Sequence, residues 1–505
     1  MNPEIVGKWL LIAALPVVVL VFFMTASAHF SYTPDDTFIY LQFAKNLIHG
    51  NGISFNAGEP SYGFTSPLWM FIIALGGRMG IDLLLAAKAL DLVFASLALI
   101  AFYLVAYEII RDASVSILAT VAFSVNAWMV RWAGTGMETS LSVFLVLLTI
   151  WFCLRNEYFV AVVFGALLTL VRPEAGLMLP LILIDVYVNS FNRKRALHHA
   201  AALVLVYVSL LMPWWVFAYS KFGTVIPNTA SAKSGLMLKF DNLISTGADV
   251  AKTIATTDGV ALAVLIIAGS MICLRSRRSG GEVGTDNRSF FLARQSIIGV
   301  GWIIVVPLFY VFMDVNVVSR YLLLVTPLIT IFAVSYVCEL VREVRGEKVA
   351  YIIVLVLAAL IMGQNQYVYR RYVGPGIQAF SKGMETCLIP AAAWLRQNTS
   401  LDAKIVVGDI GAIGYYSDRI VCDAAGLVSP EFLPFLHNGH QPYDIIQKKF
   451  YREICDVDYV IDRGEVPERL KDDPTLLPMF SRPFVGMTLN DSRITYYTIY
   501  KVVSH

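Results

Sequence analysis

The chain has 505 residues, of which 57% are hydrophobic and only 15% are charged, whereas a soluble domain carries about 25% charged residues. Its formal net charge of +2, without a basic patch interleaved with aromatic residues, excludes a nucleic-acid-binding protein. The apolar residues are concentrated in runs of roughly 15–25 residues, and a helix needs about 20 to cross a hydrocarbon core. Because backbone groups in lipid must pair with one another, we expect these runs to be transmembrane helices.

The first apolar run ends near Thr25-Ala26-Ser27-Ala28, which weakly resembles a signal-peptide cleavage site. We expect this run to be retained as the first span, because the loop with the candidate site residues follows it directly. Two later runs are divided by Arg172-Pro173-Glu174 and could instead form a broken hairpin. About eleven spans of membrane-crossing length are predicted, at residues 8–27, 83–108, 113–130, 139–153, 158–172, 175–190, 199–219, 255–274, 296–313, 321–341 and 349–369.

The distribution of Lys and Arg predicts the orientation of these spans, since basic residues favour the cytoplasmic side of short loops. With the N-terminus inside, the basic clusters at 193–195, 275–278 and 342–348 all fall inside. The outer connections, including residues 28–82, are longer and more mixed in charge. The sequence therefore predicts an N-in, C-out topology.

The chain becomes ordinary in composition after about residue 371, which predicts two domains: a transmembrane domain at 1–371 and a soluble extracytoplasmic α/β domain at 372–505. A helix is expected from Ile377 to Gln397, interrupted or begun again at Pro390. Short strands are expected at Lys404–Gly408, Arg419–Cys422, Asp458–Ile461, Phe484–Leu489 and Thr495–Val503.

The six cysteines show no CxxC pair and no zinc spacing. Three of them, Cys153, Cys273 and Cys338, lie in or beside apolar runs, where a buried thiol behaves as a small hydrophobic group. If the C-terminal third faces an oxidising compartment, a disulfide between Cys422 and Cys455 is an alternative, but we expect unpaired cysteines.

The first outer loop contains an acidic pair, Asp35-Asp36, directly after Pro34. The apolar residues that follow recur at helical spacing, and polar residues such as Lys45 lie on another face, which predicts a helix lying flat on the bilayer surface. The pair would then be fixed at the level of lipid headgroups. Either acid could equally serve only as an N-cap of this helix, and the residues alone leave both interpretations open.

Further polar residues are predicted at the same outer membrane face. The loop continues through turn-forming residues with aromatic rings such as Tyr62, and Ser66-Pro67 resembles the start of a second helix. Ionisable residues at the ends of three spans are costly at membrane depth and often mark a site: Glu138, the pair Arg172 and Glu174, and Arg320. Arginine can bind a phosphate through two parallel hydrogen bonds, although snorkelling or a local ion pair would also explain each residue.

These residues together resemble a known family. The run Asp35-Asp36-Thr37-Phe38-Ile39, the loop segments Gly58-Glu59-Pro60 and Gly63-Phe64-Thr65-Ser66-Pro67, and the later matches at Gly136-Met137-Glu138-Thr139, Arg172-Pro173-Glu174 and Arg320-Tyr321 are similar to the GT-C superfamily of membrane glycosyltransferases. They look most like the branch of the mycobacterial terminal arabinofuranosyltransferases. The outer domain adds Gly408-Asp409-Ile410-Gly411, for which a turn with glycine at positive φ is the alternative to a ligand loop.

The resemblance implies a GT-C fold and an inverting transfer from a polyprenyl-phosphate sugar, with arabinofuranose the first candidate, to a cell-envelope glycan or a protein. It assigns the catalytic base to Asp35, with Asp36 beside it and the choice between them open. The departing phosphate would be stabilised by cations. The implied donor-phosphate ligands are Arg172, Arg320 and Lys233, and the implied substrate-pocket residues are Tyr40, Lys45, Tyr62, Thr65, Glu138 and Glu174.

The resemblance also implies a multi-pass protein of the bacterial cytoplasmic (inner) membrane, with its active site extracytoplasmic and the outer domain acting as an acceptor-binding or lid element. Its partners would be the lipid donor, the glycan or protein acceptor and membrane lipid, and not nucleic acid. No cofactor is predicted with certainty, and a divalent cation stays open. A transporter or flippase is the alternative function, but it would predict two related halves with interrupted helices, and no internal repeat is visible.

Overall fold

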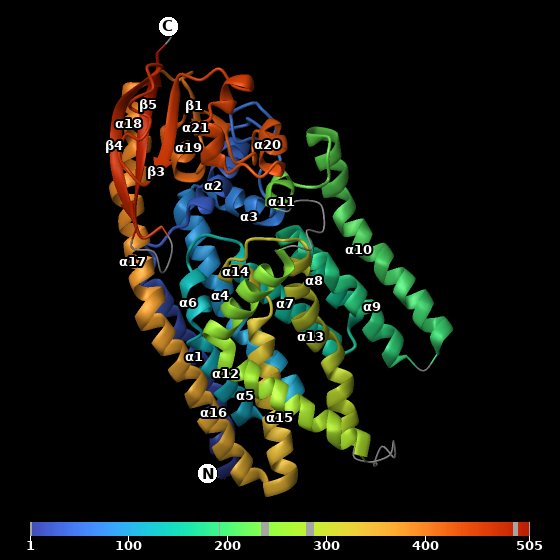
Figure 1. Ribbon diagram of the computed structural model, residues 1–505. Helices are drawn as coiled ribbons and strands as arrows, with labels where there is room; N and C mark the ends of the chain where they lie inside the picture. Colours follow the sequence, from blue (N-terminus) through green and yellow to red (C-terminus); the bar gives the residue numbers. More distant parts are fainter. Residues whose placement is uncertain (1–2, 191, 234–241, 279–286, 488–492, 504–505) are drawn as a thin grey trace.

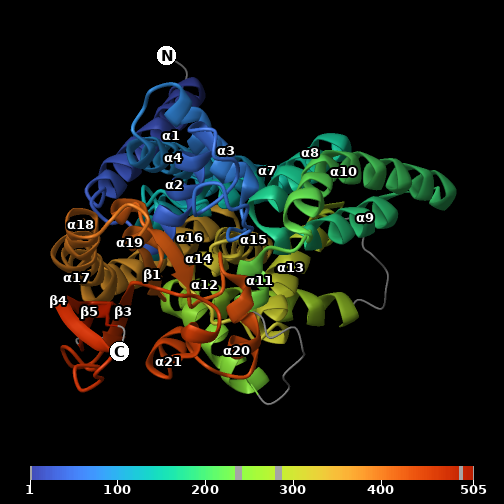
Figure 2. The same cartoon turned by 90° about the horizontal axis from the view of Figure 1, so that it is seen from above.

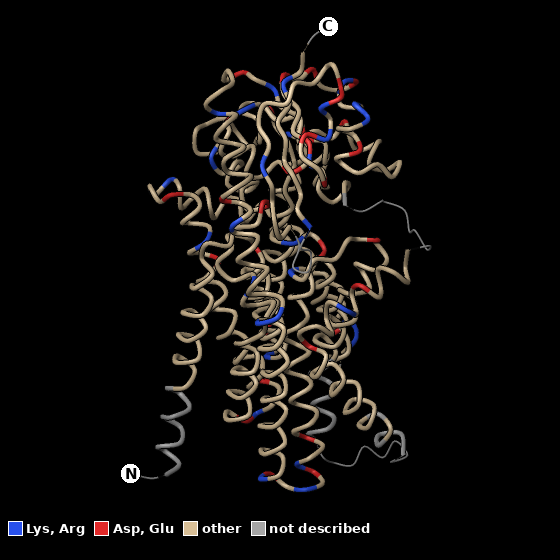
Figure 3. The backbone as a smooth tube through the Cα atoms, turned by 60° about the vertical axis from the view of Figure 1, so that its left-hand side comes forward, with Lys and Arg blue, Asp and Glu red and all other residues tan. Residues whose placement is uncertain are grey.

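The computed structural model describes residues 3–190, 192–233, 242–278, 287–487 and 493–503. Most of these residues form an elongated body of helices, and a smaller α/β layer lies at the end that holds the C-terminus (Figure 1). Charged residues are dense in this layer and at the opposite end of the body, and fewer lie along the helices between them (Figure 3). This distribution is the one expected of a protein whose middle faces lipid.

A helix lies at each of the eleven predicted spans. Within the described residues, four helical stretches are long and apolar enough to cross a membrane: Leu83–Ile110, Arg193–Phe222, Leu243–Ile272 and Glu347–Asn398. The count of eleven crossings and the N-in orientation therefore stay predictions. The helices of the body are α1 (Pro3–Ser27), α4 (Leu83–Ile110), α5 (Ala113–Ser124), α6 (Ala127–Trp132), α7 (Thr139–Leu154), α8 (Tyr158–Val171), α9 (Met178–Asn189), α10 (Arg193–Phe222), α12 (Leu243–Arg278), α13 (Asn287–Phe312), α15 (Thr326–Arg345) and α16 (Glu347–Val368).

Two predicted spans are interrupted by residues that can replace helical hydrogen bonds. The span 113–130 is two helices, because the Asn126 side chain accepts from the backbone N–H groups of Trp128 and Met129, both at 3.1 Å, and so caps α6. Between α8 and α9 the chain leaves the helix at Arg172 and forms the 3-10 turn η1 (Pro173–Leu177). Proline disfavours helical backbone in the residue before it, which explains the break at Arg172.

The first loop folds into two short helices, α2 (Asp35–Ile48) and α3 (Pro67–Arg78), which lie between the body and the α/β layer (Figure 1). The predicted helix after Pro34 is confirmed, as is the proline at the start of α3. However, α2 does not lie open on a surface. It packs against α3, α4 and the outer helix α19 (Gly411–Ser417), and its residues from Thr37 to Ala44 are buried. The expected headgroup-facing side is therefore wrong.

Figure 2 shows α8, α9 and α10 extending to one side of the molecule, while the α/β layer stands with α17 and α18 on the other. The segments α17 (Gly374–Gly383) and α18 (Ile389–Asn398) continue α16 through the π turns η3 (Tyr369–Val373) and η4 (Met384–Leu388). One helical stretch therefore runs from Glu347 to Asn398. The predicted domain boundary at 371/372 falls inside this stretch and stays a prediction.

The outer sheet has the strand order β2-β1-β3-β5-β4. Parallel pairing joins β1 to β2 and β3, and antiparallel pairing joins β5 to β3 and β4. Its strands are β1 (Lys404–Val407), β2 (Ile420–Asp423), β3 (Tyr459–Gly464), β4 (Leu476–Val485) and β5 (Ile494–Val502). Four strands lie where the sequence predicts them, whereas β4 begins earlier than the expected 484–489. Pro478 and Pro483 hide it in the sequence, and an edge strand tolerates proline.

Small helical segments fill the outer layer beside this sheet. They are η5 (Pro430–Phe432), α20 (Leu433–His437), α21 (Pro442–Gln447) and η6 (Phe450–Glu453). A disulfide joins Cys422 of β2 to Cys455 beyond η6, so the expectation of unpaired cysteines is wrong for these two. The fold brings together sulfurs that are separated by 33 positions in the sequence, which spacing alone does not reveal. Cys153, Cys338 and Cys387 are unpaired and buried, and the side chain of Cys273 lies outside the described residues.

Candidate active site

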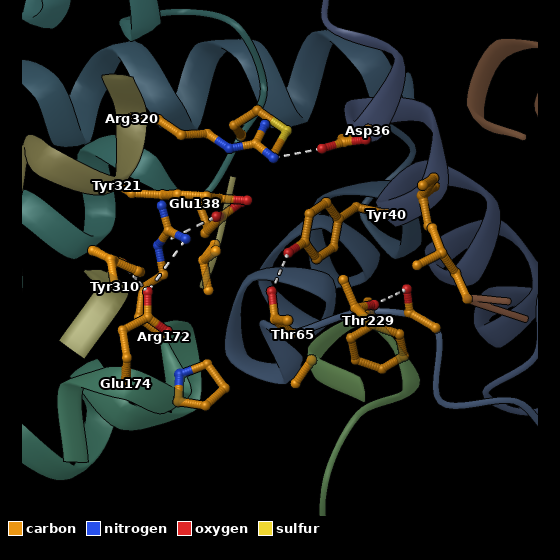
Figure 4. Close-up of a pocket in the computed structure, with 18 of the residues that line it drawn as sticks. Asp36, Tyr40, Thr65, Glu138, Arg172, Glu174, Thr229, Tyr310, Arg320 and Tyr321 are labelled. Carbon is orange, nitrogen blue, oxygen red and sulfur yellow. Dashed lines mark hydrogen bonds and ion pairs between the residues drawn. The ribbon is translucent and has the colours of Figure 1, made fainter. Parts of the chain in front are cut away.

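An open cavity of about 950 Å³ lies at the junction of the helical body, the first loop and the outer layer. Figure 4 shows that its polar side chains come from separate elements and turn toward one another. Seven of the residues predicted as site residues line it. These are Asp36, Tyr40, Thr65, Glu138, Arg172, Glu174 and Arg320.

Local backbone structure sets the direction of each charged group. Asp36 lies in the first turn of α2, which begins directly after Pro34. Glu138 precedes α7 and Arg172 follows the last residue of α8, so both stand at helix ends. Glu174 lies in η1, and Arg320 lies in the short helix α14 (Ser319–Leu322). Helix ends leave backbone groups unpaired and place side chains at the rim of the bundle, where a cavity can form.

Arg172 lies between two carboxylates and is only 4% exposed. Its Nε atom is 3.5 Å from Oε1 of Glu138, and its Nη1 atom is 3.5 Å from Oε1 of Glu174, so both ion pairs are longer than ordinary charge-assisted hydrogen bonds. The Tyr310 hydroxyl donates to Glu174 at 2.6 Å. The guanidinium lies 4.8 Å from the ring centre of Tyr321.

Several buried polar atoms in this cavity have no hydrogen-bond partner among the described residues. They are Nε and Nη2 of Arg172, Nε of Arg320 and Oε2 of Glu138. Leaving buried donors unpaired costs free energy, and the cost is larger for charged groups. A cavity lined by two arginines with such donors is suited to an anion, because a guanidinium can offer a phosphate two parallel hydrogen bonds.

The two acids of the first loop face different partners. Asp36 accepts from Nη2 of Arg320 at 2.5 Å, and its side chain stays 40% exposed, so the carboxylate is accessible. Asp35 accepts instead from the backbone N–H groups of Gly411 at 2.9 Å and Ala412 at 2.8 Å, at the start of α19. It thus caps a helix of the outer layer and not its own. Burial and the nearby Asp409 carboxylate raise the pKa of Asp35 to about 7.

The loop from Gly408 to Gly411 serves this junction. Neither glycine has a positive φ, so the expected alternative of a positive-φ turn is wrong. Gly411 is required for close approach, because a Cβ atom there would lie 2.0 Å from the backbone oxygen of Asp35. Asp409 accepts from the hydroxyl of Tyr443 at 2.8 Å and from Nη1 of Arg463 at 3.0 Å.

Three predicted site residues are not among those that line the cavity. Lys45 pairs with Asp418 of the outer layer, and the Tyr62 hydroxyl accepts from Nε1 of Trp214 at 2.9 Å. Both therefore hold elements together. The side chain of Lys233, at the end of α11 (Asn228–Lys233), lies outside the described residues.

The sequence analysis missed the wall formed by α11 and the outer layer. The Thr229 hydroxyl donates to the backbone oxygen of Gly63 at 2.8 Å, and Nδ2 of Asn228 donates to that of Leu427 at 3.1 Å. Thr229, Ala230 and Leu427 all line the cavity. Their only signal in the sequence is an ordinary polar turn after Pro227. Among the described residues, no three His, Cys, Asp or Glu side chains come close enough together to hold a metal ion.

Comparison with solved structures supports a known architecture. ArnT from Cupriavidus metallidurans in the apo state matches with a TM-score of 0.58 and 12% identity, over 98% of each chain. ArnT bound to undecaprenyl phosphate matches with a TM-score of 0.53 and 11% identity, over 97% of this chain and 98% of that one. The chain has the GT-C fold. The mycobacterial arabinofuranosyltransferase AftD has a TM-score of 0.52 at 16% identity, over 97% of this chain and 41% of that one.

Sequence comparisons give two shorter matches to this GT-C chain. The terminal beta-(1->2)-arabinofuranosyltransferase of Mycobacterium tuberculosis is 28% identical over 251 residues, which are 45% of this chain. The matched part spans 38% of that relative's length. A family model described as a domain of unknown function, DUF8728, matches residues 376–501 and so covers most of the outer layer.

Proposed function

We propose that this protein is an inverting glycosyltransferase that moves a sugar from a polyprenyl-phosphate donor to a hydroxyl group of a cell-envelope glycan or protein. The observation that carries the proposal is the cavity itself, in which the accessible carboxylate of Asp36 faces two buried arginines with unpaired donors. A carboxylate and cations some distance apart are what transfer from a phosphate leaving group requires.

In the proposed reaction, the acceptor hydroxyl attacks the anomeric carbon from the face opposite the phosphate. The new bond joins the acceptor oxygen to that carbon, and the bond between the carbon and the phosphate oxygen breaks with its electron pair going to the phosphate. Asp36 takes the proton of the acceptor hydroxyl as the general base. Arg172 and Arg320 stabilise the negative charge that grows on the departing lipid phosphate. The phosphate leaves as an anion and needs no proton donor.

The pair between Asp36 and Arg320 links donor binding to the activation of the base. A donor phosphate that takes hydrogen bonds from Arg320 competes with Asp36 for the same guanidinium. Asp36 would then turn toward the acceptor hydroxyl with less of its negative charge neutralised, and so act as a stronger base. This sequence favours binding of the donor before proton transfer.

The remaining lining residues divide the cavity into a polar and an apolar part. Glu138 and Glu174 are placed beside Arg172, where carboxylate oxygens can accept hydrogen bonds from sugar hydroxyls, and Tyr40 bonds Thr65 at 3.4 Å on the facing side. Phe309, Met313 and Val315 give an apolar wall suited to the first isoprene units of a lipid donor.

The donor and its location follow from the relatives. The matched ArnT structure contains undecaprenyl phosphate, which supports a polyprenyl-phosphate donor, and the names of two relatives support arabinofuranose as the first sugar to test. We place the cavity and the outer layer on the extracytoplasmic side of the inner membrane, because the basic residues of the predicted short loops then lie inside. The outer layer, which contributes Leu427 to the cavity wall, is proposed to bind the acceptor.

The experiment uses purified full-length protein with a small panel of polyprenyl-phosphate sugars and measures release of free lipid phosphate in the presence of glycan acceptors. Asp36→Asn should abolish transfer while the protein stays folded, since the amide cannot take the proton. Asp35→Asn is the matched control on the neighbouring position and should keep part of the activity. Full activity in Asp36→Asn would disprove the mechanism.

A further inference from the structure

Helix α4 contains two charged residues well inside an apolar segment. Lys88 is 3% exposed and Asp91 is 0% exposed. The helix begins at Leu83, and at about 1.5 Å of rise per residue Asp91 lies roughly 12 Å along it. Charged side chains at such depth are costly and need specific partners. Neither residue lines the cavity, so neither belongs to the substrate contacts described above.

Lys88 holds the segment that leads into α2. Its Nζ atom donates to the backbone oxygen of Tyr32 at 2.9 Å and to the Thr33 hydroxyl at 2.7 Å. These acceptors lie three and four positions before Asp36. Because Pro34 restricts the backbone between them, fixing Tyr32 and Thr33 also fixes where α2 begins.

Asp91, one turn further along the same helix, holds the segment that leads to Glu138. Its Oδ2 atom accepts from the backbone N–H of Thr135 at 2.7 Å, from the Thr135 hydroxyl at 3.1 Å and from the backbone N–H of Gly136 at 3.1 Å. Glu138 follows two residues later. A single carboxylate oxygen thus takes three donors from one tight turn, and hydrogen bonds to an ionised group are about twice as strong as neutral ones.

The two held segments also contact each other directly. The Thr37 hydroxyl of α2 donates to the backbone oxygen of Thr135 at 3.1 Å, and Nε1 of Trp69 donates to that of Gly136 at 3.0 Å. Gly136 has a φ of +85°, and a Cβ atom there would lie 2.8 Å from Cγ2 of Thr37. The distance between the segment with Asp36 and the segment with Glu138 is therefore set by close packing on α4.

We propose that Lys88 and Asp91 are positioning residues that hold the base Asp36 and the sugar contact Glu138 at the separation needed for transfer. This inference rests on the proposed function, because it assigns a role relative to that reaction. The two charges act as anchors: Lys88 fixes the segment before α2, and Asp91 fixes the turn before α7. An apolar helix surface could pack against these segments, but it could not satisfy their polar groups.

The first test is Lys88→Met, which keeps the length of the side chain and removes both hydrogen bonds. Because a shift of about 1 Å in a reacting group can cost about 100-fold in rate, kcat for transfer should fall by about 10- to 100-fold. The KM of the donor and the Kd of undecaprenyl phosphate should not change, since Arg172 and Arg320 keep their places. Asp91→Leu should behave in the same way, and Asp91→Asn, which keeps an acceptor oxygen, should recover much of the rate.

The control on the same helix is Ser96→Ala, which removes a hydroxyl that donates only to Leu92 of α4 and should leave kcat unchanged. If Lys88→Met fails to fold, Thr33→Val removes a single acceptor with almost no change of shape and should still lower kcat. An unchanged kcat in folded Lys88→Met or in Thr33→Val overturns the inference. A higher donor KM with unchanged kcat also overturns it, because that result would show direct contact with the donor. Full activity in Asp36→Asn would instead reject the proposed function.

Discussion

Removing the guanidinium of Arg172 should damage both stability and catalysis, and the structure allows the two effects to be separated. Arg172 is 4% exposed and lies 3.5 Å from each of two carboxylates, those of Glu138 and Glu174. Arg172→Met leaves these buried charges uncompensated, which typically costs about 3–5 kcal/mol of folding free energy. It also removes donors for the departing phosphate, and the loss of one such donor typically lowers kcat by about 100- to 1000-fold.

A second substitution distinguishes the two effects. Arg172→Met combined with Glu138→Gln removes one of the stranded charges, so the melting temperature of the purified protein should recover by several degrees relative to the single variant. The rate of lipid-phosphate release should stay low, because no cation has been restored. Arg172→Lys keeps a charge but loses the planar fork, and should fall between wild type and Arg172→Met. If the double variant regains kcat together with its melting temperature, Arg172 is only the structural partner of Glu138, and the phosphate assignment is refuted.

The remaining predictions concern the outer layer. Because the folded pKa of Asp35 is about 7 against an ordinary 3.8, the folded state keeps a proton that the unfolded state has lost, so stability should fall as pH rises from about 4 to 7. Asp35→Asn should flatten this slope in melting curves, and an unchanged slope would contradict the assignment. Replacing both Cys422 and Cys455 by Ser opens a loop with a sequence separation of 33, and should cost about 3–4 kcal/mol in denaturant unfolding under oxidising conditions but nothing in reductant. Gly411→Ala should lower activity more than the exposed Gly439→Ala, because its Cβ would meet the backbone of Asp35, and equal activities would argue against the junction.

The positions of the helices could be predicted from the sequence because hydrophobic runs have a fixed length requirement in lipid. The same reasoning located Glu138, Arg172 and Arg320, since charges at the ends of apolar runs stand out from their surroundings. It failed inside α4. Lys88 and Asp91 interrupt an apolar run in plain view, but the run is hydrophobic enough on average to mask them. Attention to single charges within a span would have found both.

Other features depend on contacts between segments that are far apart in the sequence. Lys45 was predicted to face a substrate because it lies on the polar face of α2, yet the structure covers that face with the outer layer, and Asp418 is its partner. Tyr62 was assigned on the same grounds and instead supports Trp214. Polar periodicity shows that a helix face needs polar partners, but it cannot distinguish a ligand from another part of the same chain.

The acidic pair shows why a sequence match identifies a site more readily than the residue that performs the chemistry. Successive residues of a helix point about 100° apart, so Asp35 and Asp36 cannot both face one cavity. Packing decides that Asp36 reaches Arg320 and that Asp35 reaches the backbone of Gly411 and Ala412. Loss of activity on substituting Asp35 would therefore not identify it as the base, because α2 would lose its attachment to the outer layer and displace Asp36. The base is the position at which replacement by the amide abolishes kcat without loosening that attachment.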